Sequence, residues 1–162
     1  MSGFIVGRGA SETQGKASTV LEFRAVVPAP ASRVFAALTE ARLLTRWFCD
    51  RAESEARAGG RIVLGWNRAG ASAEPFVGTW TMFAPTRACG YLGGHAGYPD
   101  GHAGLIEFAL EPGDAGTALA VRHTIPPGSG YEDIAEKYRS AWPRALARLE
   151  ELFATSRPDH DA

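Results

Sequence analysis

The chain has 162 residues, of which 45% are hydrophobic and 22% are charged, and its formal net charge is −1. This length and composition are typical of one globular domain with a sizeable core. The near-zero net charge argues against a nucleic-acid-binding surface, and no apolar run is long enough for membrane insertion. Residues 1–16 lack the continuous apolar core of a signal peptide, so a cytoplasmic location is expected.

The first third of the chain predicts one strand followed by two short helices. Residues 1–17 are rich in glycine and serine and are expected to form a flexible tail. Apolar residues alternate over 18–27 with the period of a strand that has two unlike faces. Helices are expected over 31–39 and 40–48, linked so tightly that they form one bent unit.

From residue 51 the pattern has period two, interrupted by turn signals. Strands joined by hairpins form antiparallel sheets with one buried face. A polar loop is expected over 67–74 and a glycine-rich loop over 93–101. The expected strands cover 51–57 (a polar edge strand), 61–66, 76–83, 87–92, 105–110 and 118–123.

The last expected element is one long amphipathic helix over 129–153. Ser129 and Glu132 have the spacing of a capping box. Pro143 lies in the middle, where proline costs about 3 kcal/mol and predicts a kink. The apolar stripe of such a helix must pack on something broad and apolar. It comprises Ala135, Tyr138, Trp142, Leu146, Leu149 and Phe153.

Six short patterns recur in the order expected of one known superfamily. They are Val27-Pro28 with Val34-Phe35-Ala36-Ala37-Leu38-Thr39, Leu44-Thr45-Arg46-Trp47-Phe48, Gly59-Gly60, Gly78-Thr79-Trp80 with Pro85 and Arg87, the strand Gly116-Thr117-Ala118-Leu119-Ala120-Val121-Arg122-His123, and Ala141-Trp142-Pro143-Arg144-Ala145-Leu146-Ala147-Arg148-Leu149. Together they resemble the START-like superfamily, also called helix-grip or SRPBCC, and within it the activator of heat-shock protein 90 ATPase homologue family. The resemblance covers roughly residues 18–154, with alanine at 141 in place of the usual glycine.

The predicted order and the resemblance agree on an α+β, helix-grip fold. A curved antiparallel sheet of about six to seven strands wraps around the long C-terminal helix, and the two short helices follow the first strand. Residues 18–156 would form this ligand-binding domain, followed by a short tail over 157–162. Because such a sheet does not close perfectly around one helix, the gap becomes a pocket.

Aromatic side chains of inward parity are the candidate lining of that pocket. An aromatic pocket with a few polar tips suits a planar or lipid-like ligand. The alternative is that these side chains simply fill a core. The candidates are Trp66, Trp80, Tyr91, His123, Tyr138 and Trp142, with Trp47 and Phe48 on the helices at the entrance.

Other polar residues receive simpler interpretations. His123 could orient a ligand or act as an acid or base, but a core histidine bonded to a backbone group or to Tyr138 is preferred. His95, Asp100 and His102 could bind a divalent ion, yet their glycine-rich loop holds no fixed geometry, so no metal site and no cofactor is predicted. Cys49 and Cys89 are expected to be reduced, semi-buried thiols rather than a redox pair. Glu107 and Arg122 are expected to form a surface cross-strand pair.

Three functions remain open. The first is non-enzymatic binding of a hydrophobic or aromatic small molecule. The second is an enzyme resembling polyketide cyclases or dehydratases, with a substrate near His123 and Tyr91 or Tyr138. The third, implied only by the resemblance, is a co-chaperone-like module that stimulates a heat-shock ATPase. A homodimer is a further possibility, by analogy with related sheets.

Overall fold

The computed structural model describes residues 18–67, 75–95 and 104–155. Seven strands form one antiparallel sheet in the order β1-β7-β6-β5-β4-β3-β2. Every neighbouring pair in this order is antiparallel, as hairpin connections require. The strands are β1 (Thr19–Val27), β2 (Arg51–Ser54), β3 (Arg61–Gly65), β4 (Phe76–Ala84), β5 (Ala88–His95), β6 (Gly104–Gly113) and β7 (Gly116–Ile125).

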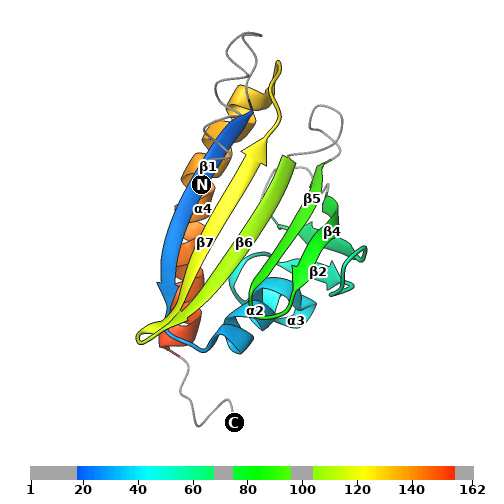
Figure 1. Ribbon diagram of the computed structural model, residues 1–162. Coiled ribbons are helices and arrows are strands. Elements are labelled where there is room, and N and C mark those ends of the chain that lie inside the picture. The colour runs from blue at the N-terminus through cyan, green and yellow to red at the C-terminus, as the bar shows by residue number, and fades with distance from the viewer. Residues whose placement is uncertain (1–17, 68–74, 96–103, 156–162) are drawn as a thin grey trace.

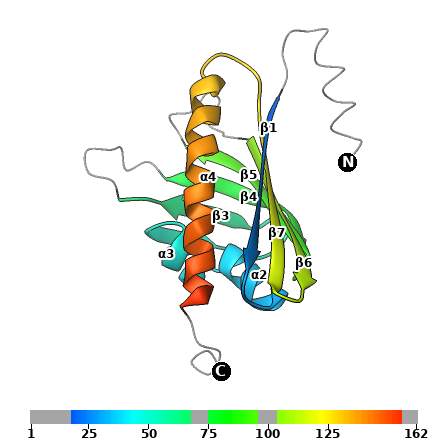
Figure 2. The same cartoon turned by 90° about the vertical axis from the view of Figure 1, so that its left-hand side faces the viewer.

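One long helix, α4 (Tyr131–Ala154), lies along one face of the sheet and follows β1 (Figure 1). Figure 2 shows the helix and the sheet as two layers, with the short helices at the end where α4 finishes. The buried stripe of α4 includes Trp142, Leu146, Leu149 and Phe153. This architecture confirms the predicted α+β, helix-grip fold.

The start of α4 differs from the prediction. The helix begins at Tyr131, and Gly130 occupies the N-cap position with a φ of 91° and no side-chain cap. Gly130 takes this left-handed conformation, which is easy only for glycine, so Ser129 lies outside the cap position and the expected capping box is wrong. The helix then continues through Pro143, and Figure 2 shows no sharp bend at its middle, so the predicted kink is not observed.

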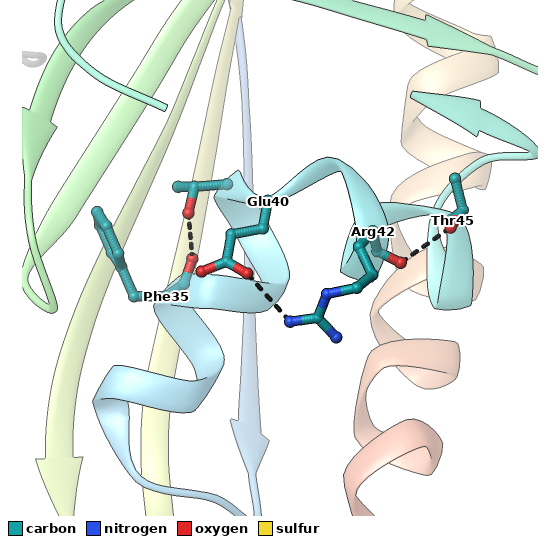
Figure 3. A network of polar contacts seen from close by, with 5 residues as sticks. Phe35, Glu40, Arg42 and Thr45 are labelled. Atoms are coloured by element: carbon teal, nitrogen blue, oxygen red, sulfur yellow. Dashed lines mark hydrogen bonds and ion pairs between the residues drawn. The ribbon is translucent and has the colours of Figure 1, made fainter. Parts of the chain in front are cut away.

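The two short helices are α2 (Ala31–Thr39) and α3 (Ala41–Trp47), and only Glu40 separates them. Glu40 is extended, with φ −96° and ψ 131°, which turns the second helix away from the first. Figure 3 shows the local contacts, in which Arg42 donates to the Glu40 carboxylate and the Thr45 hydroxyl donates to the Arg42 carbonyl. These polar contacts are exposed, so they add little stability beyond holding the turn.

Strand β5 is longer than the sequence suggested. The expected glycine-rich loop begins at residue 93, but Gly93 and Gly94 belong to the strand, which ends at His95. Gly93 lies opposite Gly78 of β4, and a Cβ at residue 93 would run into the Val77 carbonyl and the Gly78 Cα. These glycines therefore allow close backbone approach inside the sheet, rather than forming a loop.

A β-bulge reverses the expected parity at the end of β4. Trp80 pairs with Tyr91 and Met82 with Gly90, which leaves Thr81 as the extra residue. Met82, expected on the same face as Trp80, is therefore 36% exposed. Phe83 turns inward instead and packs edge-on against Trp80, at 5.4 Å between ring centroids.

The outer face of the sheet carries polar pairs. Glu107 lies opposite Arg122 in the β6–β7 register, as expected, and Arg122 also forms an ion pair of 3.1 Å with Glu22 of β1. The Arg122–Glu22 pair is partly exposed, so it is a surface feature and not catalytic machinery. Within the described ranges, no helix is both long and apolar enough to cross a bilayer.

The close approach at Gly93 gives a direct test of the β4–β5 register. Gly93→Ala should lower the free energy of unfolding by about 1–3 kcal/mol, because the strand backbones must separate to admit the Cβ. Gly113→Ala is the matched control, since its Cβ would meet only the Gly116 carbonyl at 3.8 Å. Urea denaturation of both variants measures the difference, and equal stability of the two would contradict this register.

Candidate functional site

Seven aromatic rings form a closed circuit between the sheet and α4. They come from four strands or strand ends (β3, β4, β5 and β6), from the end of α3 and from α4, so most elements of the fold contribute. Consecutive ring centroids are 5.5–6.2 Å apart, within the usual range for aromatic pairs. In order around the circuit, the members are Tyr91, Phe108, Trp142, Phe48, Trp66, His95 and Phe76, which returns to Tyr91.

Phe48 is the member of the circuit that links α3 to α4 and to the end of β3. Phe48 stacks on Trp142 with centroids 5.6 Å apart and an interplanar angle of 19°, and on its other side it meets Trp66 edge-on at 5.5 Å. Phe48 and Trp66 are half-buried, whereas Tyr91 and Trp142 are buried, so the circuit runs from the surface to the core.

Two of the predicted site residues, Trp47 and Trp80, lie next to this circuit and are not members of it. Trp47 packs against Phe48, and its indole N–H donates to the Ala37 carbonyl at 2.9 Å, which ties α3 to α2. Trp80 packs edge-on against Tyr91, and its N–H donates to the Ser54 hydroxyl at 3.1 Å, which ties β4 to β2. Both are almost fully buried, and each contacts one member of the circuit without belonging to it.

The remaining predicted residues meet at the middle of α4. The Trp142 indole N–H donates to Nδ1 of His123 at 3.0 Å, and His123 is fully buried. Because Nδ1 accepts this bond, the proton of the neutral imidazole must be on Nε2. The Tyr138 ring lies edge-on to His123, at 4.4 Å between centroids. His123 is thus a core histidine, as preferred, with Trp142 as a partner that the sequence did not suggest.

Of the candidate acid–base groups, Tyr138 is in ring contact with His123, whereas Tyr91 lies apart from it. Tyr91 and His123 share one inward row, but Ile106 lies between them on β6, which places the two residues about 10 Å apart. The only buried polar residues in the described part of the chain are Thr39, Thr117 and His123. None of these buried polar residues is a carboxylate, the group that orients the imidazole in a Ser-His-Asp triad.

The thiols are uncharged near neutral pH. Burial raises the pKa of Cys49 to about 11 and that of Cys89 to about 12. Both are free and buried, more so than the semi-buried state expected. Because only the thiolate is a good nucleophile, neither cysteine is activated for chemistry.

Sequence reasoning missed three members of the circuit. Phe76 has the same parity on β4 as Trp80, and Phe108 has the inward parity of β6, so both carried a usable signal. His95 was assigned to a loop because of the glycines before it. The other two candidate metal ligands, Asp100 and His102, lie outside the described residues, and the described residues contain no cluster suited to a metal ion.

Comparisons with known proteins agree with the fold. The family model described as "Activator of Hsp90 ATPase homolog 1-like protein" matches residues 28–154. Protein MLL2253 from Mesorhizobium loti has a similar structure, with 17% identity, a TM-score of 0.73, and coverage of 86% of this chain and 99% of that one. The Aha1 dimer from Colwellia psychrerythraea is 19% identical, with a TM-score of 0.68 and coverage of 83% and 96%.

A third similar structure is that of DynU16, a protein of the dynemicin biosynthetic locus. It is 19% identical with a TM-score of 0.69, and the alignment covers 86% of this chain but 48% of DynU16. At these identities the solved structures establish the fold alone. No curated protein matches the chain.

The contact between Trp142 and His123 can be measured with a double-mutant cycle. We expect Trp142→Phe, His123→Leu and the double variant to give a coupling energy of about 1 kcal/mol or more, because either single change leaves a buried polar group without its partner. Urea unfolding of the four proteins provides the value. If the two substitutions lower the free energy of unfolding additively, the Trp142–His123 hydrogen bond is contradicted.

Proposed function

The chain belongs to the activator of Hsp90 ATPase homolog 1-like family, and from that premise we propose that it binds a hydrophobic or aromatic small molecule between the sheet and α4. The observation that carries the proposal is the closed circuit of aromatic rings. Aromatic faces arranged around a centre offer stacking and edge contacts to a flat ligand. Phe48 and Trp66, which are half-buried, are the route by which a ligand would enter.

The arrangement favours binding over catalysis. His123 already uses Nδ1 to accept a bond from Trp142, and Ile106 separates it from Tyr91. A cyclase-like enzyme would have to work by positioning its substrate, with little help from acid–base groups. DynU16, from a biosynthetic locus, keeps this second function open. Turnover that survives His123→Ala combined with Tyr91→Phe and Tyr138→Phe would exclude these residues as its catalytic groups.

The family description is the basis for a third function, stimulation of a heat-shock ATPase. An interaction surface of that kind needs exposed apolar area. The exposed large hydrophobic residues lie on three strands, β1, β4 and β5, and comprise Val20, Val26, Val77, Met82 and Leu92. Absence of binding in a titration with the chaperone would remove this candidate.

The homodimer and the cytoplasmic location stay predictions. The structure from Colwellia psychrerythraea is that of a dimer, which supports a dimeric state here by analogy. Light scattering of the purified chain would decide between one and two copies.

Ligand binding can be tested by thermal shift against lipids, steroid hormones and uncharged polycyclic aromatics. We expect at least one class to raise the melting temperature, since a ligand at 100 times its Kd adds about 2.7 kcal/mol of stability. Phe48→Ala should then weaken binding about tenfold or more, because it removes a stacking face from the circuit.

The matched control is Phe83→Ala. Phe83 is also partly buried and contacts two rings, Trp80 at 5.4 Å and Phe35 at 5.2 Å, but it lies outside the circuit. It should lower stability without changing affinity. Equal loss of affinity in both variants, or no binding by any class, would overturn the proposed site.

A further inference from the structure

The indole N–H groups around the circuit already donate hydrogen bonds to other protein atoms. All four tryptophans of the chain donate their indole N–H internally: Trp47 to Ala37 O, Trp66 to Phe48 O at 2.7 Å, Trp80 to Ser54 Oγ and Trp142 to His123 Nδ1. A ligand in the circuit would therefore meet the faces and edges of these rings and not their hydrogen-bond donors.

The two buried threonine hydroxyls also donate hydrogen bonds to protein atoms. The Thr39 hydroxyl donates to the Phe35 carbonyl at 2.9 Å, and the Thr117 hydroxyl donates to the Ala29 carbonyl at 2.7 Å. In the ranges that the structure describes, the buried set contains no Asp, Glu, Lys or Arg. The interior thus offers no fixed charge to balance a charged ligand, and burying an unpaired charge is strongly unfavourable.

Tyr91 is the exception. It is only 2% exposed, yet its hydroxyl forms no hydrogen bond to any described residue. Every fully enclosed side-chain nitrogen or oxygen in the described part of the chain does have a partner. The Tyr91 oxygen is therefore not fully enclosed, and it borders a space that can admit a solvent molecule or a ligand atom.

The surroundings of that hydroxyl are apolar and uncharged. The Tyr91 ring contacts Phe76, Trp80 and Phe108, and the thiols of Cys49 and Cys89 are the titratable groups that add to the rise of its pKa. Burial raises the pKa of Tyr91 above its ordinary value, so the hydroxyl keeps its proton. The Tyr91 hydroxyl is thus a neutral hydrogen-bond donor on the buried side of the circuit.

We infer that the ligand is an uncharged, flat molecule with one hydrogen-bond acceptor, such as a ring ketone, whose oxygen accepts the Tyr91 O–H while its rings contact the circuit. This inference rests on the proposed function and narrows it. Carboxylates and ammonium compounds are excluded by the lack of a buried countercharge. Ligands rich in hydroxyls are disfavoured because most of their polar groups would be buried without partners.

The test uses matched probes that differ by one oxygen. Fluorenone and fluorene have nearly the same flat shape, and so do 2-acetylnaphthalene and 2-ethylnaphthalene, whereas 2-naphthoate adds a charge. We expect the wild-type chain to bind each ketone about 3- to 10-fold more tightly than its hydrocarbon, and to bind 2-naphthoate at least tenfold more weakly than 2-acetylnaphthalene. Tyr91→Phe should abolish the preference for ketones and leave the affinity for hydrocarbons unchanged.

The hydrocarbons also report whether the variant is folded. Tyr131→Phe is the matched control, because Tyr131 is a buried tyrosine in a separate cluster at the start of α4, and this variant should keep the ketone preference. Equal affinity for ketone and hydrocarbon in the wild type, or a preference that persists in Tyr91→Phe, overturns this inference while leaving the proposed function intact. Failure of every probe to bind overturns both.

Discussion

The bond from Trp142 to His123 joins the two layers of this fold. The indole N–H of the helix residue donates to Nδ1 of the strand residue at 3.0 Å, and both side chains are almost fully buried. The same indole stacks on Phe48 at one side and meets Phe108 of β6 edge-on at 5.9 Å. One side chain therefore fixes the height of α4 above the sheet and, with it, the position of the ring circuit. A buried hydrogen bond of this kind also restricts the helix to one register along the sheet.

Much of the fold follows from patterns that the residues display locally. The alternation along β7 places Leu119, Val121 and His123 inward, and the three-and-four spacing in α4 places Trp142 and Leu149 toward the sheet. Both patterns depend only on which residues are apolar and on the geometry of strands and helices. The fold class and element order could therefore be predicted from sequence, together with the family.

The errors lie where neighbouring strands or turns override the local pattern. Gly93 reads as a loop residue in isolation, but opposite Gly78 it permits close strand contact. The bulge at Thr81 exchanges the roles of Met82 and Phe83, and nothing in the alternation of β4 announces it. The left-handed Gly130 shifts the start of α4 past the expected capping box. Each outcome depends on a cross-strand partner or a backbone angle, which periodicity cannot supply.

The candidate site, too, could be predicted from the sequence only in part. Parity predicted eight inward side chains, but it could not separate Trp47 and Trp80, which lie next to the circuit, from Trp66 and Phe48, which belong to it. That distinction depends on ring contacts and on where each indole N–H finds an acceptor. Once these acceptors are known, the chemistry around the circuit is narrow in the described part of the chain, because the ring faces are aromatic and the Tyr91 hydroxyl is a donor without a protein acceptor.

A crystal structure of the chain grown with fluorenone would show whether a flat ligand binds between the sheet and α4. We expect a flat tricycle among the rings, with its ketone oxygen within hydrogen-bond distance of the Tyr91 hydroxyl and the Trp142–His123 bond intact. A centre filled by the protein's own side chains, with fluorenone absent or bound on the outer face of the sheet, would contradict this expectation.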